Sequence, residues 1–529
     1  MAADSSERRD PERAAGLTSR AAPWAGRAFA VLAVLVSDLS LVADDRSPTA
    51  PLPSGARLRF EQLAGEAPLT RVALSPDGRR LYAGSAAGQV GVWDLESGRL
   101  LDVLAAEGAS EPVLALHVNA ERDVQVLAGS ELLRWDNSRR IDRPSIETES
   151  AATCGFAADG RRLAVCGPEP PIRIFDTASG SSVRTLDPTL SADELAYSPE
   201  GTILAGARLW RLCLWSTDSG DEFSKRRLEG TVRGFAFSAD GRHIFADVDY
   251  EGILILESET GAILRTLSRP GIPDLKDEQR RAIAVSPDSS LLAETGPAGT
   301  LIVWEIFTGR RVLTLAGHEG LITGLAFHPD GRRLVSIGRD GAALLWDLHN
   351  ESLLSAEGAG DSLTAARLQQ LWHQLGDDSG DHAYRAFVAL LHHPEQALAL
   401  IESPPGLDGL AERLIRNLDD TDSAVRSAAY ERLKSLSVAA EPLLRERLER
   451  DTSAELASRL RRLLSRLRGR RGERERHELA RRHRLLRSVH LLKWIGTPEA
   501  RDLLDELGQA DDAAVRAEVD AVRHWLVRN

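Results

Sequence analysis

The 529-residue sequence predicts a multidomain protein in which an all-β seven-bladed propeller is followed by an all-α helical domain. Three observations lead to this prediction. A tight-turn pattern recurs at steps of 44, 38, 41, 40, 48 and 42 residues, and most copies are followed by a short aromatic segment about eighteen residues later. After Gly358 the alternation typical of strands gives way to apolar residues at helical spacing.

The repeated turn lies between segments in which apolar and polar residues alternate, as in short strands. In order it reads SPDG at 75–78, NAER at 119–122, AADG at 157–160, SPEG at 198–201, SADG at 238–241, SPDS at 286–289 and HPDG at 328–331. The aromatic residues that follow are Trp93, Trp135, Phe175, Trp215, Trp304 and Trp346, whereas the fifth copy has only LILE. Four antiparallel strands per copy and seven copies predict a closed ring of seven blades.

Two segments compete to complete the last blade. RLRFEQLAG at 57–65 precedes the first inner strand, and ESLLSAE at 351–357 follows the last copy. Either segment would lock the ring and remove its exposed sheet edges.

The repeats resemble WD repeats, from Leu58 to about Leu354. In that family a histidine, a serine, an aspartate and a tryptophan form a buried hydrogen-bonded set, and the matching residues here are His318, Ser336, Asp340 and Trp346. The first and sixth copies have Ala83 and Glu294 at the serine position. We therefore expect these blades to depend mainly on apolar packing and turns.

His318, Ser336 and Asp340 are also the residue types of a hydrolase triad. A catalytic serine must be reachable, but Ser336 lies inside a predicted strand between Leu334 and Ile337 and is not on a GxSxG turn. We interpret the set as structural and predict no catalytic residue, no cofactor and no enzymatic activity. Hydrolysis by these three residues is the less favoured alternative.

The chain after Gly358 is expected to be helical. Thr497 and Pro498 form a good helix start. Two sets of residues have the spacing of the second half of a HEAT-type repeat: Asp422, Val425, Arg426, Ala429 and Leu433, then Asp512, Val515, Arg516, Val519 and Val522. The whole layout resembles bacterial proteins that join a WD-repeat propeller to a HEAT-like tail.

We accordingly divide the chain into a leader (1–43), a linker (44–56), the propeller (57–357), a helical connector (358–406) and a HEAT-like domain (407–529). The leader resembles a secretory signal, because arginines precede the apolar run AFAVLAVLV and the small residue Ala43 follows it. This predicts export to the periplasm or the extracellular space. If 1–43 is instead a disordered leader, the protein stays in the cytoplasm.

Composition sets further bounds. Only four of the 66 basic residues are lysine, a bias that indicates a G+C-rich bacterial genome. No run of about twenty apolar residues occurs, so an integral membrane protein is not expected. Three cysteines cannot make a disulfide framework, although a bond between Cys154 and Cys166 is left open. HELARRH at 477–483 spaces its histidines wrongly for zinc, and no metal site is predicted.

A tract at 459–487 contains 13 arginines and three glutamates. It is either a solvated helix face or a surface for nucleic acid or another polyanion. The net charge of −13 argues against nucleic acid as the main partner. Nucleic-acid binding through this tract is therefore kept as an alternative function.

The favoured function is a non-catalytic scaffold that binds other proteins or peptides. The longest repeat step places extra residues in the loop SRPGIPDLKDEQRRA at 268–282. Its charged residues form a candidate partner-binding loop: Asp274, Lys276, Glu278, Arg280 and Arg281. Partner identity and oligomeric state do not follow from the sequence.

Overall fold

The computed structural model describes residues 52–528 except for short gaps. The gaps are 54, 61, 64–66, 106–110, 137–138, 142–145, 147–150, 170, 187–190, 270–280, 351–362, 403–413, 437–440, 450–452 and 468–470. The predicted leader and the ESLLSAE segment therefore lie outside the described residues. No helix in the described part of the chain is long and apolar enough to cross a membrane.

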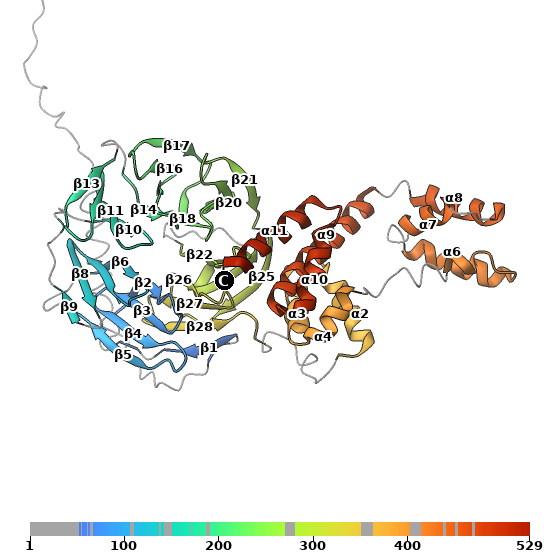
Figure 1. Cartoon of the computed structure of the whole chain (residues 1–529), viewed down its shortest axis with the longest axis horizontal. Coiled ribbons are helices and arrows are strands. Elements are labelled where there is room, and N and C mark those ends of the chain that lie inside the picture. The colour runs from blue at the N-terminus through green and yellow to red at the C-terminus, as the bar shows by residue number, and fades with distance from the viewer. Residues whose placement is uncertain are drawn as a thin grey trace, which may run out of the picture. The chain divides into compact units, whose positions relative to one another are not determined.

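Seven four-stranded antiparallel sheets are arranged around a ring (Figure 1). Blades 1 to 3 contain β2 (Leu69–Leu74), β3 (Arg80–Ser85), β4 (Val90–Asp94) and β5 (Leu100–Leu104); β6 (Val113–Val118), β7 (Val124–Ala128), β8 (Glu131–Asp136) and β9 (Arg139–Ile141); and β10 (Thr153–Phe156), β11 (Arg162–Cys166), β12 (Ile172–Asp176) and β13 (Ser182–Thr185). Blades 4 and 5 contain β14 (Glu194–Tyr197), β15 (Ile203–Arg208), β16 (Arg211–Ser216) and β17 (Glu222–Arg227); and β18 (Val232–Phe237), β19 (His243–Val248), β20 (Gly252–Glu257) and β21 (Ile263–Leu267). The predicted fold class is thus confirmed for the propeller.

Blade 6 contains β22 (Ile283–Val285), β23 (Leu291–Thr295), the short helix η1 (Pro297–Gly299), β24 (Thr300–Glu305) and β25 (Arg310–Ala316). Blade 7 contains β26 (Ile322–Phe327), β27 (Arg333–Gly338) and β28 (Ala343–Asp347). Its fourth strand is β1 (Ala56–Arg59), which pairs with β28 in antiparallel register. The N-terminal candidate for ring closure therefore supplies the outer strand of blade 7.

The repeated turn has a simple local cause. In blade 1, Gly78 adopts a positive φ of 68° and its N–H donates to the carbonyl of Ser75. The Ser75 hydroxyl accepts the N–H of Arg80 at 2.9 Å. The same serine contact recurs in three further blades, at Ser198, Ser238 and Ser286. Each turn thus satisfies its backbone groups locally and fixes the register of the two strands it joins.

The aromatic residue of the third strand anchors each blade. All six aromatics are buried between neighbouring sheets, and Leu256 takes this place in blade 5. Cys154 faces the core shared by blades 2 and 3, whereas Cys166 faces the core shared by blades 3 and 4. Both cysteines are free, because Cys154 pairs in register with Val165 and the two thiols lie on opposite faces of the sheet.

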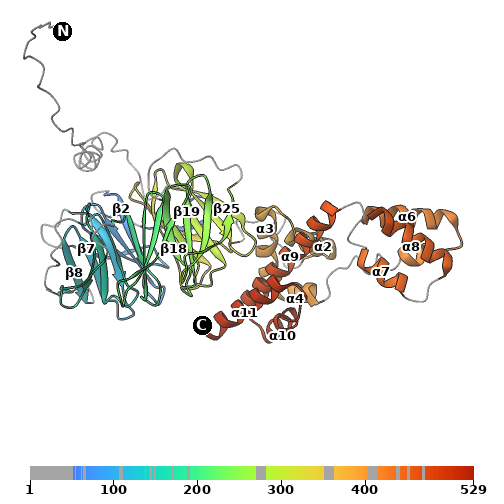
Figure 2. The same cartoon turned by 90° about the horizontal axis from the view of Figure 1, so that it is seen from above.

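Helices follow the propeller, as predicted. One group contains α2 (Ala365–Leu375), α3 (Gly380–Leu391), α4 (Pro394–Glu402), α9 (Arg471–Ile495), α10 (Pro498–Leu507) and α11 (Ala513–Arg528) (Figure 2). Its apolar core is continuous with blades 6 and 7. A second group, α6 (Ser423–Leu436), α7 (Glu441–Glu449) and α8 (Ala454–Leu467), has a core of its own.

Candidate functional site

Blade 7 brings together the four residues of the predicted set. The indole N–H of Trp346 donates to the Ser336 hydroxyl oxygen at 2.8 Å, and that oxygen lies 2.7 Å from Nε2 of His318. Nδ1 of His318 lies 3.0 Å from the Asp340 carboxylate. With the histidine proton on Nδ1, each group donates to the next, from indole to hydroxyl to imidazole to carboxylate. The four side chains form one continuous hydrogen-bonded chain across the blade.

The four side chains are largely shielded from solvent, and the charge of Asp340 is balanced by hydrogen bonds. Ser336 and Trp346 are both 0% exposed. Burial alone would raise the pKa of Asp340, but the hydrogen bond and charge of His318 together with two backbone N–H groups outweigh it and hold that pKa below its usual value. The carboxylate also accepts the backbone N–H groups of Glu319 and Ala342. All of these hydrogen-bond partners belong to blade 7 or to the loop that leads into it.

Blade 6 contains a charged counterpart of this network. The indole N–H of Trp304 donates to Glu294, which occupies the serine position, at 2.9 Å. Glu294 forms an ion pair with Arg269, whose guanidinium also lies 2.7 Å from Asp247. Burial, together with the nearby Asp247, raises the pKa of Glu294 to about 7 against the opposing charge of Arg269. Blade 6 thus combines its apolar packing with a buried ionic network that the sequence did not predict.

The predicted partner-binding loop falls largely outside the described residues, including Asp274, Lys276, Glu278 and Arg280. Its last member, Arg281, is described and is buried rather than available to a partner. The guanidinium of Arg281 forms ion pairs with two carboxylates, at 3.1 Å from Asp247 and 3.3 Å from Asp249.

Arg269 and Arg281 flank residues 270–280, and both bind Asp247. The two ends of the long repeat step are thus anchored to one buried carboxylate. Sequence reasoning missed Arg269, although an arginine at each end of the longest step was a usable signal.

Two buried ion pairs join the last helices to blade 6. Arg487 of α9 binds Glu305 at 2.9 Å and donates to the carbonyl of Leu375 at 2.7 Å. Lys493, also in α9, forms an ion pair with Asp288 of the SPDS turn, and both side chains are almost fully buried. Arg487 belongs to the arginine tract but is neither solvated nor free for an anionic partner. Both interpretations of the tract are therefore wrong for this residue.

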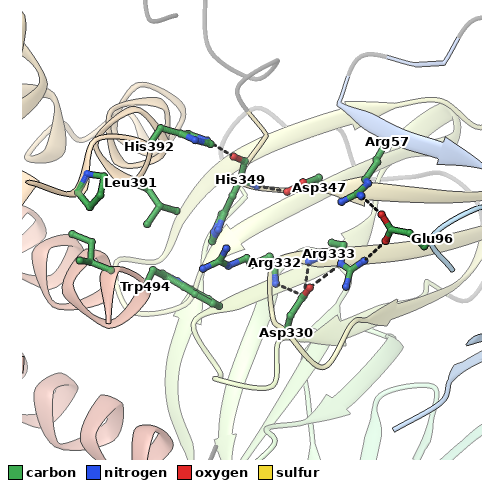
Figure 3. A pocket seen from close by; sticks show the side chains of 12 residues that line it. Arg57, Glu96, Asp330, Arg332, Arg333, Asp347, His349, Leu391, His392 and Trp494 are labelled. Carbon is green, nitrogen blue, oxygen red and sulfur yellow. Dashed lines mark hydrogen bonds and ion pairs between the residues drawn. The ribbon is translucent and has the colours of Figure 1, made fainter. Parts of the chain in front are cut away.

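A cleft of about 530 Å³ lies where blade 7 meets these helices (Figure 3). The Arg332 guanidinium sits 4.9 Å from the centre of the Trp494 ring, and His349 packs edge-on against the same ring. Burial, reinforced by Arg332, lowers the pKa of His349 to about 3, so its imidazole is neutral. Other charges in the cleft are already paired, as between Arg333 and Asp330 at 2.7 Å. The cleft is largely a junction between two parts of the fold.

No group of three or more metal-ligating side chains occurs in the part of the chain that the structure describes. The described residues therefore give no support for a metal site.

Comparison with known proteins agrees with the geometry. The WD40 family (WD domain, G-beta repeat) matches residues 60–94 and 309–347, which correspond to blade 1 and to the end of blade 6 with blade 7. The WD40 model thus matches blade 1 and blade 7 directly, and the other five blades have the same four-stranded antiparallel architecture. The chain is 25% identical over 328 residues to nuclear distribution protein PAC1 of Coccidioides posadasii, and 25% identical over 320 residues to nuclear distribution protein nudF of Aspergillus niger.

These two matches cover 59% and 57% of this chain and 64% of each relative, so the chain spans less than two thirds of their length. A third similarity, to eukaryotic translation initiation factor 3 subunit I of Nematostella vectensis, has 23% identity and covers 52% of this chain and 91% of the relative.

Proposed function

We propose that the chain is a non-catalytic scaffold that binds other proteins through its WD40 propeller and its helical tail. The observation that carries the proposal is the closed ring of seven blades, in which two blades match the WD40 family and β1 completes the last blade. Closure fixes the blades and leaves their connecting loops as a rigidly mounted surface. One relative is by name the subunit of an assembly, and the similarity spans nearly all of that protein.

The structural role of His318, Ser336, Asp340 and Trp346 is part of this proposal. The full burial of Ser336 supports it, because a catalytic serine must be reached by its substrate. An activated-serine probe should leave the folded protein unlabelled. Labelling of the wild type that disappears in Ser336→Ala would instead support hydrolysis.

The HEAT-like character of the tail is supported by two matching helix starts. Asp422 accepts the N–H of Ala424, while Arg426 donates to the carbonyl six residues before it. Asp512 and Arg516 make the same two contacts in α11, with the N–H of Ala514 and the carbonyl of Ala510. Two segments far apart in sequence thus have an aspartate and an arginine at the same positions, and these make the same contacts at the start of a helix, as expected for repeats.

Export of a bacterial protein also belongs to the proposal, on the basis of the leader pattern and the arginine bias. N-terminal sequencing of the mature protein tests it. A mature N-terminus near residue 44 supports export. A protein that keeps residues 1–43 and is found in the cytoplasmic fraction contradicts it.

Capture experiments test the scaffold itself. Immobilised full-length protein should retain specific proteins from the cells that make it, under gentle salt. Recovery of no specific protein, compared with beads carrying heat-unfolded chain, would contradict the proposed function.

A further inference from the structure

Two neighbouring blades carry large apolar side chains at the tips of equivalent hairpins. Leu209 and Trp210 form the turn between β15 and β16 in blade 4, and Tyr250 lies in the turn between β19 and β20 in blade 5. Their exposed fractions are 47%, 40% and 84%. Exposed aromatic and apolar groups that gather at one place mark interaction surfaces more often than single exposed ones do.

The backbone at these positions is unfavourable for the residues found there. Leu209 has a φ of 51° and Tyr250 a φ of 67°, in the left-handed region that costs an L side chain free energy. The corresponding turns of other blades place glycine in this conformation, as at Gly88, Gly129 and Gly341. Tyr250 is largely exposed and gains little packing to offset the strain, whereas Leu209 is about half exposed and offsets only part of it. Packing in the fold therefore does not account for Tyr250.

The two turns share a hydrogen-bonded base. The connection from blade 4 to blade 5 donates the N–H of Leu228 to the carbonyl of Trp210 at 2.8 Å and the N–H of Val232 to the carbonyl of Leu209 at 2.7 Å. The neighbouring Thr231 carbonyl accepts the N–H of Asp249 at 3.0 Å. The exposed side chains are therefore presented on a fixed framework, which reduces the entropy lost on binding.

Positive charge accompanies the apolar groups. The Arg227 guanidinium lies 5.8 Å from the centre of the Trp210 ring. Arg227 pairs in register with Arg211 across β16 and β17, and like charges directly opposite each other repel. In the described part of the chain neither arginine forms an ion pair with a carboxylate. The nearby Glu251 carboxylate is turned to the backbone of the blade 4–5 connection, where it accepts the N–H groups of Glu229 at 2.7 Å and of the next residue at 3.3 Å, and not to either arginine.

We propose that this surface, the blade 4–5 patch (Leu209, Trp210, Arg211, Arg227 and Tyr250), binds an acidic segment of a partner protein that carries apolar side chains. The aromatic and leucine side chains would cover the apolar residues of the segment, and its carboxylates would relieve the repulsion between the two arginines. The patch has two arginines on adjacent strands and not a longer basic stripe that could follow a phosphate backbone, which favours a protein segment over nucleic acid as the occupant. The inference rests on the proposed scaffold function and names one of its surfaces.

The test is a selection of random peptides of roughly a dozen residues, displayed on phage, against immobilised full-length protein. Enriched peptides should be acidic and carry leucine or aromatic residues. Their affinity for the double variant Trp210→Ser/Tyr250→Gly should fall by about tenfold or more, as expected for loss of buried aromatic anchors. Phe223→Ser is the matched control, because Phe223 is another exposed aromatic of blade 4, 42% exposed, outside the patch.

Folding is monitored by thermal unfolding in the double variant and in two single glycine variants. Leu209→Gly and Tyr250→Gly should leave the thermal midpoint unchanged or higher, since glycine removes the strain. No enrichment, enrichment of basic peptides, or peptides that bind the double variant as well as the wild type would each overturn the patch. Binding of single-stranded oligothymidylate that the double variant abolishes would also overturn it, in favour of nucleic acid.

The scaffold proposal fails separately. If cellular partners are captured equally by wild type and double variant, the patch is wrong while the scaffold function stands. If folded wild type captures no specific partner, the scaffold function fails first.

Discussion

Blades 6 and 7 each bury a tryptophan, but they satisfy its indole N–H with different chemistry. In blade 7 the acceptor is the neutral hydroxyl of Ser336. In blade 6 it is the carboxylate of Glu294, balanced by Arg269. Blade 4 gives a third case, because Gly206 stands at this position and Trp215 has a buried indole nitrogen without a hydrogen-bond partner among the described residues. A hydroxyl, a carboxylate or glycine can thus occupy this position in a blade. How much the position contributes to stability depends on the groups around it.

The largest difference should appear when the charge balance of blade 6 is broken. Arg269→Met leaves Glu294 buried without its cation and removes one of the cations around Asp247. The free energy of unfolding should fall by about 3–5 kcal/mol, as for one partner lost from a buried ion pair. Urea unfolding, followed by tryptophan fluorescence, measures the change.

Arg265→Met is the matched control, because Arg265 is a neighbouring arginine that donates to the carbonyls of Ile306 and Phe307 rather than to the carboxylate cluster. A loss no larger in Arg269→Met than in Arg265→Met would contradict the ionic account of blade 6.

A smaller loss is expected in blade 7. Ser336→Ala deprives the Trp346 indole and Nε2 of His318 of their shared partner without leaving an unpaired charge. The expected cost is about 1–3 kcal/mol, measured by the same urea unfolding. Ser181→Ala, at an exposed serine, serves as the control and should change little. Equal stability of Ser336→Ala and wild type would show that the network is not structural.

The two blades should also respond to pH with opposite sign. Burial raises the pKa of Glu294 from 4.5 to about 7, so the folded state binds a proton that the unfolded state has released. Stability relative to Glu294→Gln should therefore fall as the pH rises from 4.5 to 7. Despite its burial, Asp340 has a pKa held below 3.8 by His318. Stability relative to Asp340→Asn should be present above pH 3.8 and be lost as the pH falls through the lowered pKa.

Unfolding free energies of the wild type and the two variants, measured from below pH 3.8 up to pH 7, give both slopes. Slopes of the same sign would contradict the opposite shifts of the Glu294 and Asp340 pKa values.

The smallest effect should come from blade 4. Trp215→Phe removes no hydrogen bond within the described structure, so its cost beyond lost packing should be about 1 kcal/mol or less. Trp346→Phe should cost more, because it also removes the bond to Ser336. Thermal unfolding of the two variants side by side decides the order, and an inverted order would mean that packing dominates both sites.

Much of the propeller could be predicted because its signals are local. The turn at Gly78 and the aromatic residue Trp93 belong to one blade, and such units repeat along the chain. The blade 7 set was found from its resemblance to WD repeats, and its members lie within 28 residues of one another, from His318 to Trp346.

The contacts that the sequence did not predict are long-range and ionic. Arg487 and Glu305 are 182 residues apart, and Lys493 and Asp288 are 205 residues apart. In the sequence Arg487 looks like part of a solvated helix face and nothing singles out Lys493, because periodicity reports which face is apolar and not which distant carboxylate a cation meets. For the same reason the sequence predicts mainly apolar packing and turns in blade 6 and does not reveal the charged network at Glu294.

Partner capture by Ser336→Ala tests directly whether His318, Ser336 and Asp340 are structural residues of blade 7. Wild type and variant would be immobilised at a temperature where both are folded and exposed to the same cell extract. If the triad-like residues only hold the blade together, the two proteins will capture the same partners in equal amounts, although the variant unfolds at a lower temperature. Loss of capture by a folded Ser336→Ala protein would contradict the account, because it would place the function of the chain in these residues.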